Sequence, residues 1–345
     1  MAATIAIQKP TENSPSSAMP SVSSRTFHIA GIPVTVYGID ELPQPCDAVA
    51  CLWLLHPRLE AKESMRPVGT DVIWDWNSRR PSSSKKGLIA VAFDQRNHGA
   101  REVEKLANEP WRSPTPNPRH AQDMFSIFHG TAVDTSLLMD HLASYVFNEC
   151  NSPPIDQHFV MGISLGGHAA WQVIFHEPRV SAAVIIIGCP DYIRVISDRA
   201  RLSKLPSYSD DSFVGSPDFP NALVSAVIKR DPKGLLFGLD PITPAPPASE
   251  QDRLRKILDA KLKGKALLVC SGGSDRMVPY HCSAPFMEFL KNAAAGWYAD
   301  GDVYVEDNVY DGIGHQYSDG MRKDAVRFLG DILEGRDLAK RLSRI

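Results

Sequence analysis

Short, almost continuously apolar segments recur along the chain. Runs of this length favour β-strands that are covered on both faces, as in a parallel sheet flanked by helices. The pattern predicts four such strands, over residues 48–55, 88–93, 182–187 and 266–270. Two further strands, at residues 158–161 and 303–309, complete the set. An alternating segment at residues 27–37, with Gly31 and Pro33 near its turn, predicts a short pair of edge strands.

Between the strands, apolar residues recur at helical spacing. The longest series predicts a helix whose apolar face carries Phe125, Phe128, Ala132, Leu138, Leu142 and Val146. Residues 285–295 and 322–333 show the same spacing. Strands that alternate with helices predict an α/β fold, with a mostly parallel, doubly wound sheet flanked by helices.

Two segments interrupt this alternation. Residues 1–25 are rich in Ser, Thr, Pro and Ala and lack apolar periodicity, which predicts a disordered leader before one domain at residues 26–345. Residues 191–262 form an insertion after the strand at 182–187, and nine prolines fall within residues 190–247. A long insertion after a central strand is expected to be a lid or cap over a pocket, with a tolerated surface elaboration as the alternative.

Composition and charge limit the class of protein. Of the 345 residues, 43% are hydrophobic and 22% are charged, which is typical of a globular chain with a sizeable core. The net charge of −3 provides no basic excess to bind a phosphate backbone, so nucleic acid is not an expected partner.

The sequence also limits where the protein is expected to reside. The longest aliphatic run, residues 183–187, is far shorter than the roughly 20 residues that cross a bilayer, and no secretory signal pattern begins the chain. We therefore expect no membrane span and a soluble, cytoplasmic protein. The C-terminal tripeptide Ser343-Arg344-Ile345 loosely resembles a peroxisomal address, which is the alternative location.

The six cysteines are too sparse for a disulfide scaffold. Cys51, Cys189 and Cys270 lie in apolar runs, which predicts free, buried thiols in a reducing compartment. The sequence contains no C-x-x-C pair and no H-E-x-x-H motif, so it predicts no metal site.

The strongest chemical signal is the G-x-S-x-G motif Gly162-Ile163-Ser164-Leu165-Gly166, which follows the strand at 158–161 and opens a helix. A turn this tight requires glycine at positions 162 and 166, and it raises the Ser164 hydroxyl into the open. The turn also directs the N–H of Leu165 and the helix N-terminus toward the place where an oxyanion would form. A serine in an ordinary Gly-rich turn is the alternative interpretation.

A serine nucleophile needs a base, and the base needs a group that orients it. Asp275 comes just past the end of the strand at 266–270, and His315 lies in a Gly-flanked loop after the strand at 303–309. The order Ser164, Asp275, His315 is the one expected when all three side chains project from one edge of a parallel sheet. The sequence therefore predicts Ser164 as nucleophile, His315 as base and Asp275 as acid.

With these motifs, the chain resembles the serine hydrolases of the α/β-hydrolase superfamily from residue 27 to its C-terminus. Residues 54–58 stand where that family places an oxyanion loop, and residues 93–99 resemble its D-x-R-x-H-G segment. Residues 117–124 precede a long helix, as in small members similar to dienelactone hydrolases and to the catalytic domains of prolyl-oligopeptidase-like enzymes. The resemblance implies the α/β-hydrolase fold.

The oxyanion loop departs from the family pattern. The usual glycine after the loop histidine is Pro57 here, and proline has no N–H to donate. The backbone N–H of Arg58 is then expected to be the second oxyanion donor, beside that of Leu165.

Other residues have competing roles. Asp191 follows the strand at 182–187 and is the rival for the triad acid, because some members of the superfamily place the acid there. His98 and His120 are expected to organise turns by hydrogen bonding, and His168 is expected to be packed or to cap the helix.

These observations predict a serine hydrolase that cleaves a carboxylic ester, a thioester or a related acyl bond through an acyl-enzyme, with a small-molecule acyl substrate and no cofactor. A peptidase of the prolyl-oligopeptidase type is one alternative. That class generally carries a large N-terminal propeller, whereas only 26 residues precede the first predicted strand here. A non-catalytic ligand-binding module is the other alternative. The motifs do not choose among esters, lactones and thioesters, and they do not set an oligomeric state.

Overall fold

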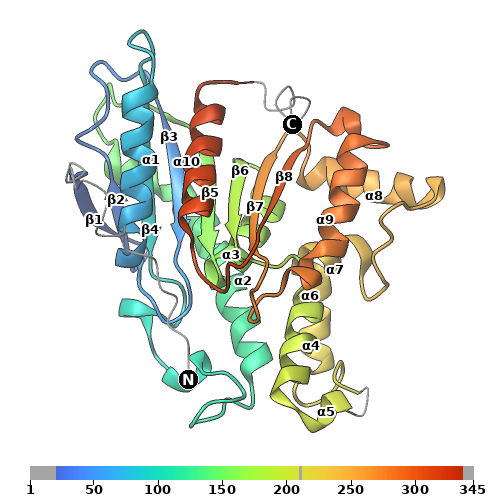
Figure 1. Ribbon diagram of the computed structural model, residues 1–345. Helices are drawn as coiled ribbons and strands as arrows, with labels where there is room; N and C mark the ends of the chain where they lie inside the picture. The colour runs from blue at the N-terminus through green and yellow to red at the C-terminus, as the bar shows by residue number, and fades with distance from the viewer. Residues whose placement is uncertain (1–20, 210–211, 337–345) are drawn as a thin grey trace.

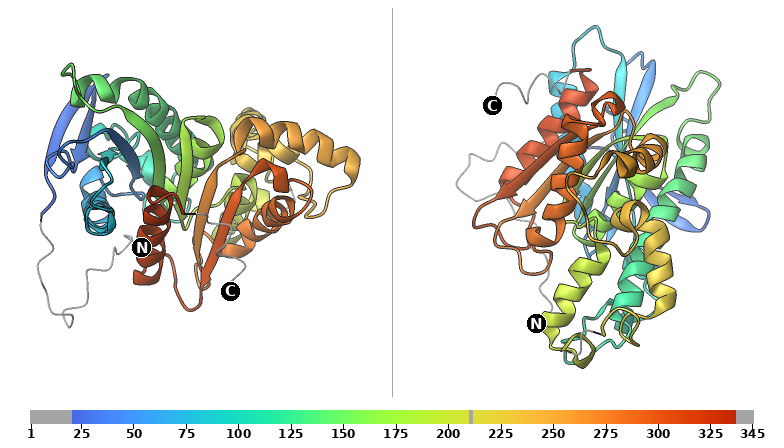
Figure 2. Two further views of the ribbon diagram at one scale, coloured as in Figure 1. Left: turned by 90° about the horizontal axis from the view of Figure 1, so that it is seen from above. Right: turned by 90° about the vertical axis from the view of Figure 1, so that its right-hand side faces the viewer.

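Eight strands form one open sheet, and helices cover both of its faces (Figures 1 and 2). The computed structural model describes residues 21–209 and 212–336. The strand order is β1-β2-β4-β3-β5-β6-β7-β8, and all neighbours from β4 to β8 in that order pair in parallel. The strands are β1 (Ser24–Ile29), β2 (Ile32–Tyr37), β3 (Ala48–Leu55), β4 (Lys86–Phe93), β5 (Ile155–Ile163), β6 (Val180–Ile186), β7 (Ala266–Gly272) and β8 (Tyr304–Tyr310).

This arrangement confirms the predicted mostly parallel, doubly wound sheet. Every predicted strand is present, with its ends shifted by a few residues. The prediction of two edge strands at residues 27–37 is wrong in one respect, because only β1 lies at the edge of the sheet. β2 pairs antiparallel with both β1 and β4, and Val34 and Val36 are fully buried there.

The helices alternate with the strands, as the periodicity predicts. They are α1 (Arg66–Arg79), α2 (His120–Val146), α3 (Leu165–His176), α4 (Tyr192–Ser203), α5 (Pro206–Ser209), α6 (Asn221–Arg230), α7 (Pro232–Phe237), α8 (Ala248–Lys261), α9 (Tyr280–Ala295) and α10 (Asp319–Leu333). Four 3₁₀ turns join them, η1 (Lys62–Met65), η2 (Gly99–Arg101), η3 (Lys105–Asn108) and η4 (Ala299–Gly301). The sequence analysis does not predict α1, although its buried residues, which include Val68, Val72 and Trp76, do have helical spacing.

Side-chain alternation along each strand divides the core into two layers. On β3, Val49, Cys51 and Trp53 belong to the layer that α2, α3 and α9 cover. The intervening Ala50 and Leu52 belong to the layer that α1 and α10 cover. Because both faces are buried, the central strands are continuously apolar in sequence. Figure 2 shows α1 and α10 on the face opposite α2 and α3.

The chain between β6 and β7 contains the five helices α4 to α8. Figure 1 shows α4 and α5 at the end of the molecule where α2 begins, whereas α8 lies beside α9 and far from α4. α8 contacts α3 and leads directly into β7, so it is part of the helical layer. The segment around α4 is therefore the part of residues 191–262 that lies beside the carboxyl ends of the strands.

Several other expectations concern the chain as a whole. All six cysteines are free, and Cys51, Cys189 and Cys270 are buried as predicted. Within residues 21–209 and 212–336, no helix combines the length and the apolar character that crossing a membrane requires. Most of the predicted leader and the tripeptide at residues 343–345 lie outside the described residues, and β1 begins at Ser24.

A buried carboxylate on α2 holds the loop that follows β4. Asp134 accepts hydrogen bonds from Nε and Nη2 of Arg96, at 3.0 and 2.8 Å, and from Nη2 of Arg101 at 2.8 Å. Gly130 leaves room for this contact, since a Cβ there would lie 2.4 Å from Cδ of Arg96. The loop at residues 94–101 is thereby fixed against α2, next to the loop that follows β3.

We expect Asp134→Asn to lower the free energy of unfolding by about 1–3 kcal/mol, because the substitution leaves two arginines without a charged acceptor. Urea denaturation followed by far-UV circular dichroism measures this loss. Asp140→Asn on the same helix is the matched control, because Asp140 and its partner Arg179 are both exposed. The control should change stability by less than about 0.5 kcal/mol, and equal losses in the two variants would contradict the prediction.

Candidate active site

Ser164 occupies a strained turn between β5 and α3. Its backbone angles are φ 55° and ψ −111°, which an L-residue rarely adopts. Its N–H donates to the carbonyl of Ile186 on the neighbouring strand β6, at 2.9 Å. The surrounding backbone is so close that a Cβ on Gly162 would lie 2.0 Å from the carbonyl oxygen of Gly166. A Cβ on Gly166 would lie 2.0 Å from that of Leu55, at the end of β3. The motif glycines are therefore required by contact.

A continuous series of hydrogen bonds joins Ser164, His315 and Asp275. The Ser164 Oγ lies 2.9 Å from Nε2 of His315, and Nδ1 of His315 lies 2.7 Å from Oδ2 of Asp275. Because a carboxylate only accepts hydrogen bonds, Nδ1 carries the proton and Nε2 is left to accept the Ser164 hydroxyl. The side chains of His315 and Asp275 are 8% and 0% exposed, so the series is largely shielded from water.

Local structure fixes Asp275 at the end of β7. Its second oxygen, Oδ1, accepts the backbone N–H groups of Met277 and Val278, at 2.8 and 3.0 Å. The two glycines before it let the His315 loop approach closely, because a Cβ on Gly272 would lie 2.6 Å from the carbonyl oxygen of Gly314. These contacts hold the carboxylate toward the imidazole, and hydrogen bonds to the charged form stabilise it.

Asp191, the rival for the acid, has a different position. It is the N-cap of α4, and its Oδ1 accepts the backbone N–H of Arg194 at 3.0 Å. Burial raises the pKa of its carboxyl group. Within the described part of the chain, the N–H at Nδ1 of His315 donates to Asp275 and to no other carboxylate.

Leu165 and Arg58, the two predicted oxyanion donors, line the same pocket as Ser164. Leu165 is the first residue of α3, and neither its N–H nor that of Arg58 donates to an acceptor within residues 21–209 and 212–336. The loop that carries Arg58 is held by the buried His56, whose Nδ1 lies 2.7 Å from the carbonyl oxygen of Pro57. Nε2 of His56 accepts the backbone N–H of Gln95 at 2.9 Å, and Nε2 of Gln95 donates to the carbonyl of His56.

Four other histidines around the site are buried, and burial disfavours their charged form. Desolvation lowers the pKa of His56 and of His168 to about 4, and it also lowers the pKa of His98 and His120. His98 Nδ1 contacts the carbonyl of Arg96, and His168 Nδ1 contacts that of Cys189. These four side chains hydrogen-bond to the backbone of loops around the site, and their contacts do not include Ser164.

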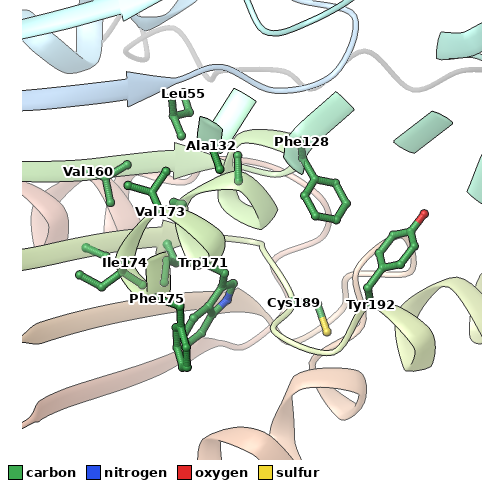
Figure 3. Packing of buried hydrophobic residues seen from close by; sticks show 14 of the residues in the cluster. Leu55, Phe128, Ala132, Val160, Trp171, Val173, Ile174, Phe175, Cys189 and Tyr192 are labelled. Carbon is green, nitrogen blue, oxygen red and sulfur yellow. The ribbon is translucent and has the colours of Figure 1, made fainter. Parts of the chain in front are cut away.

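A pocket opens over Ser164, with about 430 Å³ of space between its walls and open mouth. One wall is apolar, and Figure 3 shows Phe128 of α2 close to Tyr192 of α4, with ring centroids 5.3 Å apart. The Tyr192 hydroxyl donates to the carbonyl of Ala121, which joins the insertion to α2. The pocket is lined by Arg58, Met124, Phe128, Ser164, Leu165, His168, Tyr192, Val195, Ile196, Arg199, Met277, Val278 and His315.

The sequence analysis missed one charged residue of this pocket. Arg199 comes from α4, inside the insertion, and its Nη2 donates to the carbonyl of Met277 at 3.0 Å. Nothing in the local sequence distinguishes it from the other arginines of α4, because its position depends on how the insertion packs over the strand ends.

Three residues of types that commonly bind metal ions lie close together outside the pocket lining. Among the residues that the structure describes, Asp198, His281 and Cys282 could together hold a metal ion. Asp198 already accepts two hydrogen bonds from Arg201, at 3.1 and 2.7 Å, and His281 is exposed. The carboxylate is therefore already engaged, and we assign no metal to this group.

Solved structures with a similar backbone fold support this architecture. TT1662 from Thermus thermophilus matches with a TM-score of 0.54 and 21% identity, over 91% of this chain and 99% of that chain. A putative dipeptidyl aminopeptidase IV from Bacteroides ovatus matches with a TM-score of 0.51 and 14% identity, over 92% of this chain but 36% of that one. No protein-family model matches the sequence, and a search of curated proteins finds no match. The chain has the α/β-hydrolase fold, as predicted.

We expect stability to fall as the pH is lowered from about 6.5 to 4, because the unfolded chain then binds protons that buried histidines such as His168 exclude. Each such histidine contributes at most about 1.4 kcal/mol per pH unit to the slope of the unfolding free energy against pH in that window. In His168→Gln the slope should be shallower by about 1 kcal/mol per pH unit between pH ~6 and ~4.5 in urea denaturation. His28→Gln removes an exposed histidine and is the matched control. An equal change of slope in both variants would contradict the assignment.

Proposed function

We propose that the protein is a serine hydrolase that cleaves a carboxylic ester, a thioester or a related acyl bond through an acyl-enzyme intermediate. The observation that carries this proposal is the hydrogen-bonded series Ser164–His315–Asp275, with steps of 2.9 and 2.7 Å, at the floor of a pocket. The α/β-hydrolase fold supports a hydrolase, and the tautomer of His315 that Asp275 imposes is the one that a general base needs.

In the first step, the Ser164 oxygen attacks the substrate carbonyl and its proton passes to Nε2 of His315. Asp275 holds the imidazole and stabilises the imidazolium that forms. The carbonyl oxygen becomes negative, and the N–H of Leu165 with the N-terminus of α3 faces it. With the N–H of Arg58 as second donor, each is expected to contribute about 3 kcal/mol to stabilising the transition state.

The tetrahedral intermediate then collapses: its bond to the leaving oxygen or sulfur breaks, His315 donates its proton to that atom, and the acyl group remains on Ser164. In the second step, His315 takes a proton from a water molecule that attacks the acyl-enzyme, and it returns this proton to the Ser164 oxygen when the bond to the acyl group breaks. The acid is released and Ser164 is regenerated with its proton. Within the chain, the proton moves between Ser164 and His315, which already lie within hydrogen-bond distance, and we propose the cycle without a cofactor.

We expect Ser164→Ala to lower the turnover of a para-nitrophenyl ester by about 10⁴–10⁶-fold, because the nucleophile is lost while the fold is retained. The variant should also lose covalent labelling by a fluorophosphonate probe. Ser126→Ala, at an exposed position on α2, is the matched control and should keep both activity and labelling. If Ser164→Ala is labelled and turns over the ester like the native chain, Ser164 is not the nucleophile. Absence of labelling in the native chain would favour a non-catalytic binding protein.

The two candidate acids can be separated in the same assay. Asp275→Asn should lower kcat by about 10⁴-fold, because an amide no longer fixes the tautomer of His315. Asp191→Asn should change kcat by less than about tenfold, since an asparagine oxygen still caps α4. Circular dichroism verifies that both variants fold. A larger loss for Asp191→Asn than for Asp275→Asn would reverse the assignment.

A further inference from the structure

Two arginines reach the pocket from separate parts of the chain. Arg58 follows β3 in the loop that His56 holds, and Arg199 comes from α4 of the insertion. Both line the same pocket as Ser164 and His315. The proposed mechanism uses only the backbone N–H of Arg58, so the two guanidinium groups have no part in the acyl transfer described above.

The hydrogen bonds of these guanidinium groups go only to uncharged acceptors. Nη1 of Arg58 donates to the carbonyl of Asn108 at 2.5 Å. Nη1 of Arg199 lies 3.1 Å from Nε2 of His120, and its Nη2 donates to the carbonyl of Met277. An arginine has five N–H donors. Within residues 21–209 and 212–336, Nε and Nη2 of Arg58 and Nε of Arg199 make no hydrogen bond.

The histidine between the two arginines does not balance their charge. Nδ1 of His120 lies 2.9 Å from the carbonyl of Glu109, so Nδ1 carries the proton and Nε2 accepts from Arg199. Burial lowers the pKa of His120 well below its usual value, and the charges of Arg199 and Arg58 add to this effect. His120 is therefore neutral, and it orients the guanidinium of Arg199.

The carboxylates of the region are already engaged or too distant. Asp275 accepts from His315, Met277 and Val278, and Asp198 accepts from Arg201. In the described part of the chain, no carboxylate lies within ion-pair distance of Arg58 or Arg199. Burial, together with the positive charge of the nearby Arg199, lowers the pKa of Arg58 to about 10, while the carboxylate of Glu109 acts in the opposite direction. The two guanidinium groups of the pocket thus have no carboxylate at ion-pair distance among the described residues, and the charges of Glu109 near Arg58 and of Asp275 and Asp198 near Arg199 act on them only from farther away.

Several other partly buried arginines of the described chain are paired with carboxylates. Arg79 contacts Asp331, Arg101 contacts Asp134 and Arg327 contacts Glu306. An unpaired charge in such surroundings is costly, because water is removed and no ion replaces it. A ligand that brings its own anion would relieve this cost in the pocket.

We propose that the substrate carries a carboxylate that Arg58 and Arg199 bind while Ser164 attacks its ester or thioester carbonyl. The inference rests on the proposed function and narrows its substrate class. A planar guanidinium matches a carboxylate with two parallel hydrogen bonds, which a neutral group of the same shape cannot replace. The apolar wall, which includes Met124, Phe128 and Val195, faces the carbon chain between the two functional groups.

Matched pairs of substrates test the proposal. Monomethyl glutarate and its carboxamide analogue place the charge on the acyl side, and para-carboxyphenyl acetate and its carboxamide analogue place it on the leaving group. In one of the two pairs we expect kcat/KM to be about 10–100-fold higher for the carboxylate, since charge-assisted hydrogen bonds are strong. That pair identifies the side on which the anion lies. No preference for the carboxylate in either pair would overturn the proposal.

Variants then locate the anion site. Arg199→Gln should reduce the ratio of kcat/KM between carboxylate and carboxamide to about 1–3, and Arg199→Lys should retain part of it because the charge remains. Arg194→Gln, at an exposed position of the same helix, is the matched control and should keep the full ratio. A ratio that survives Arg199→Gln unchanged would show that this arginine only ties α4 to the loop at Met277.

A binding measurement separates this inference from the proposed hydrolysis. In Ser164→Ala protein, calorimetry should show the carboxylate compound of the preferred pair binding at least about tenfold more tightly than its carboxamide analogue. Adding Arg199→Gln to that protein should abolish the difference. If the native chain fails to react with fluorophosphonate but this preference persists, hydrolysis is refuted and the anion site stands. If labelling occurs and the preference is missing, the hydrolase stands and the anion site is refuted.

Discussion

The close approach of three backbone segments at Ser164 is the constraint on which the rest of the site depends. A Cβ on Gly162 or Gly166 would lie 2.0 Å from a carbonyl oxygen, so the turn after β5 closes only with glycine at both positions. This closure brings the end of β3 against the start of α3 and holds Ser164 at φ 55°. Strain of this kind persists only where the surrounding structure enforces it, and here two parallel strands and a buried helix do so.

Burial and a small number of hydrogen-bond partners determine the electrostatics of the site. Asp275 is surrounded by donors, two from the backbone and one from His315, so its charge is stabilised although its side chain is fully buried. The neighbouring His168 is kept neutral by the same burial, which lowers its pKa to about 4. Among the described histidines, His315 is the one that contacts Ser164, while buried histidines such as His56 and His168 hold the backbone of the surrounding loops. Arg199 lines the same pocket and has no carboxylate at ion-pair distance among the described residues.

The pocket is assembled from three regions that are distant in sequence. The loop after β3 is joined to the loop after β4 by the hydrogen bonds between His56 and Gln95. The loop after β4 is in turn fixed to α2 by Asp134, which binds Arg96 and Arg101. α4 is attached to α2 through the hydroxyl of Tyr192. Helix α2 is thus a common support for the loop after β4 and for α4, through Asp134 and the carbonyl of Ala121. Rigid supports of this kind keep the reacting atoms aligned.

The sequence by itself determined the sheet and most of the helices, and it singled out Ser164, Asp275 and His315, which the structure joins by hydrogen bonds. It could do so because strand burial is recorded in runs of apolar residues, and because a tight turn leaves its glycines at fixed spacing. The helix α1 shows helical spacing that the sequence analysis did not use. Only the tertiary structure joined His315 to Asp275 rather than to Asp191, and only it placed Arg199 in the pocket. The first depends on the close approach of the loops after β7 and β8, and the second on how an irregular, proline-rich insertion packs over the strand ends. Such packing arises from contacts between distant segments that leave no local periodicity in the chain.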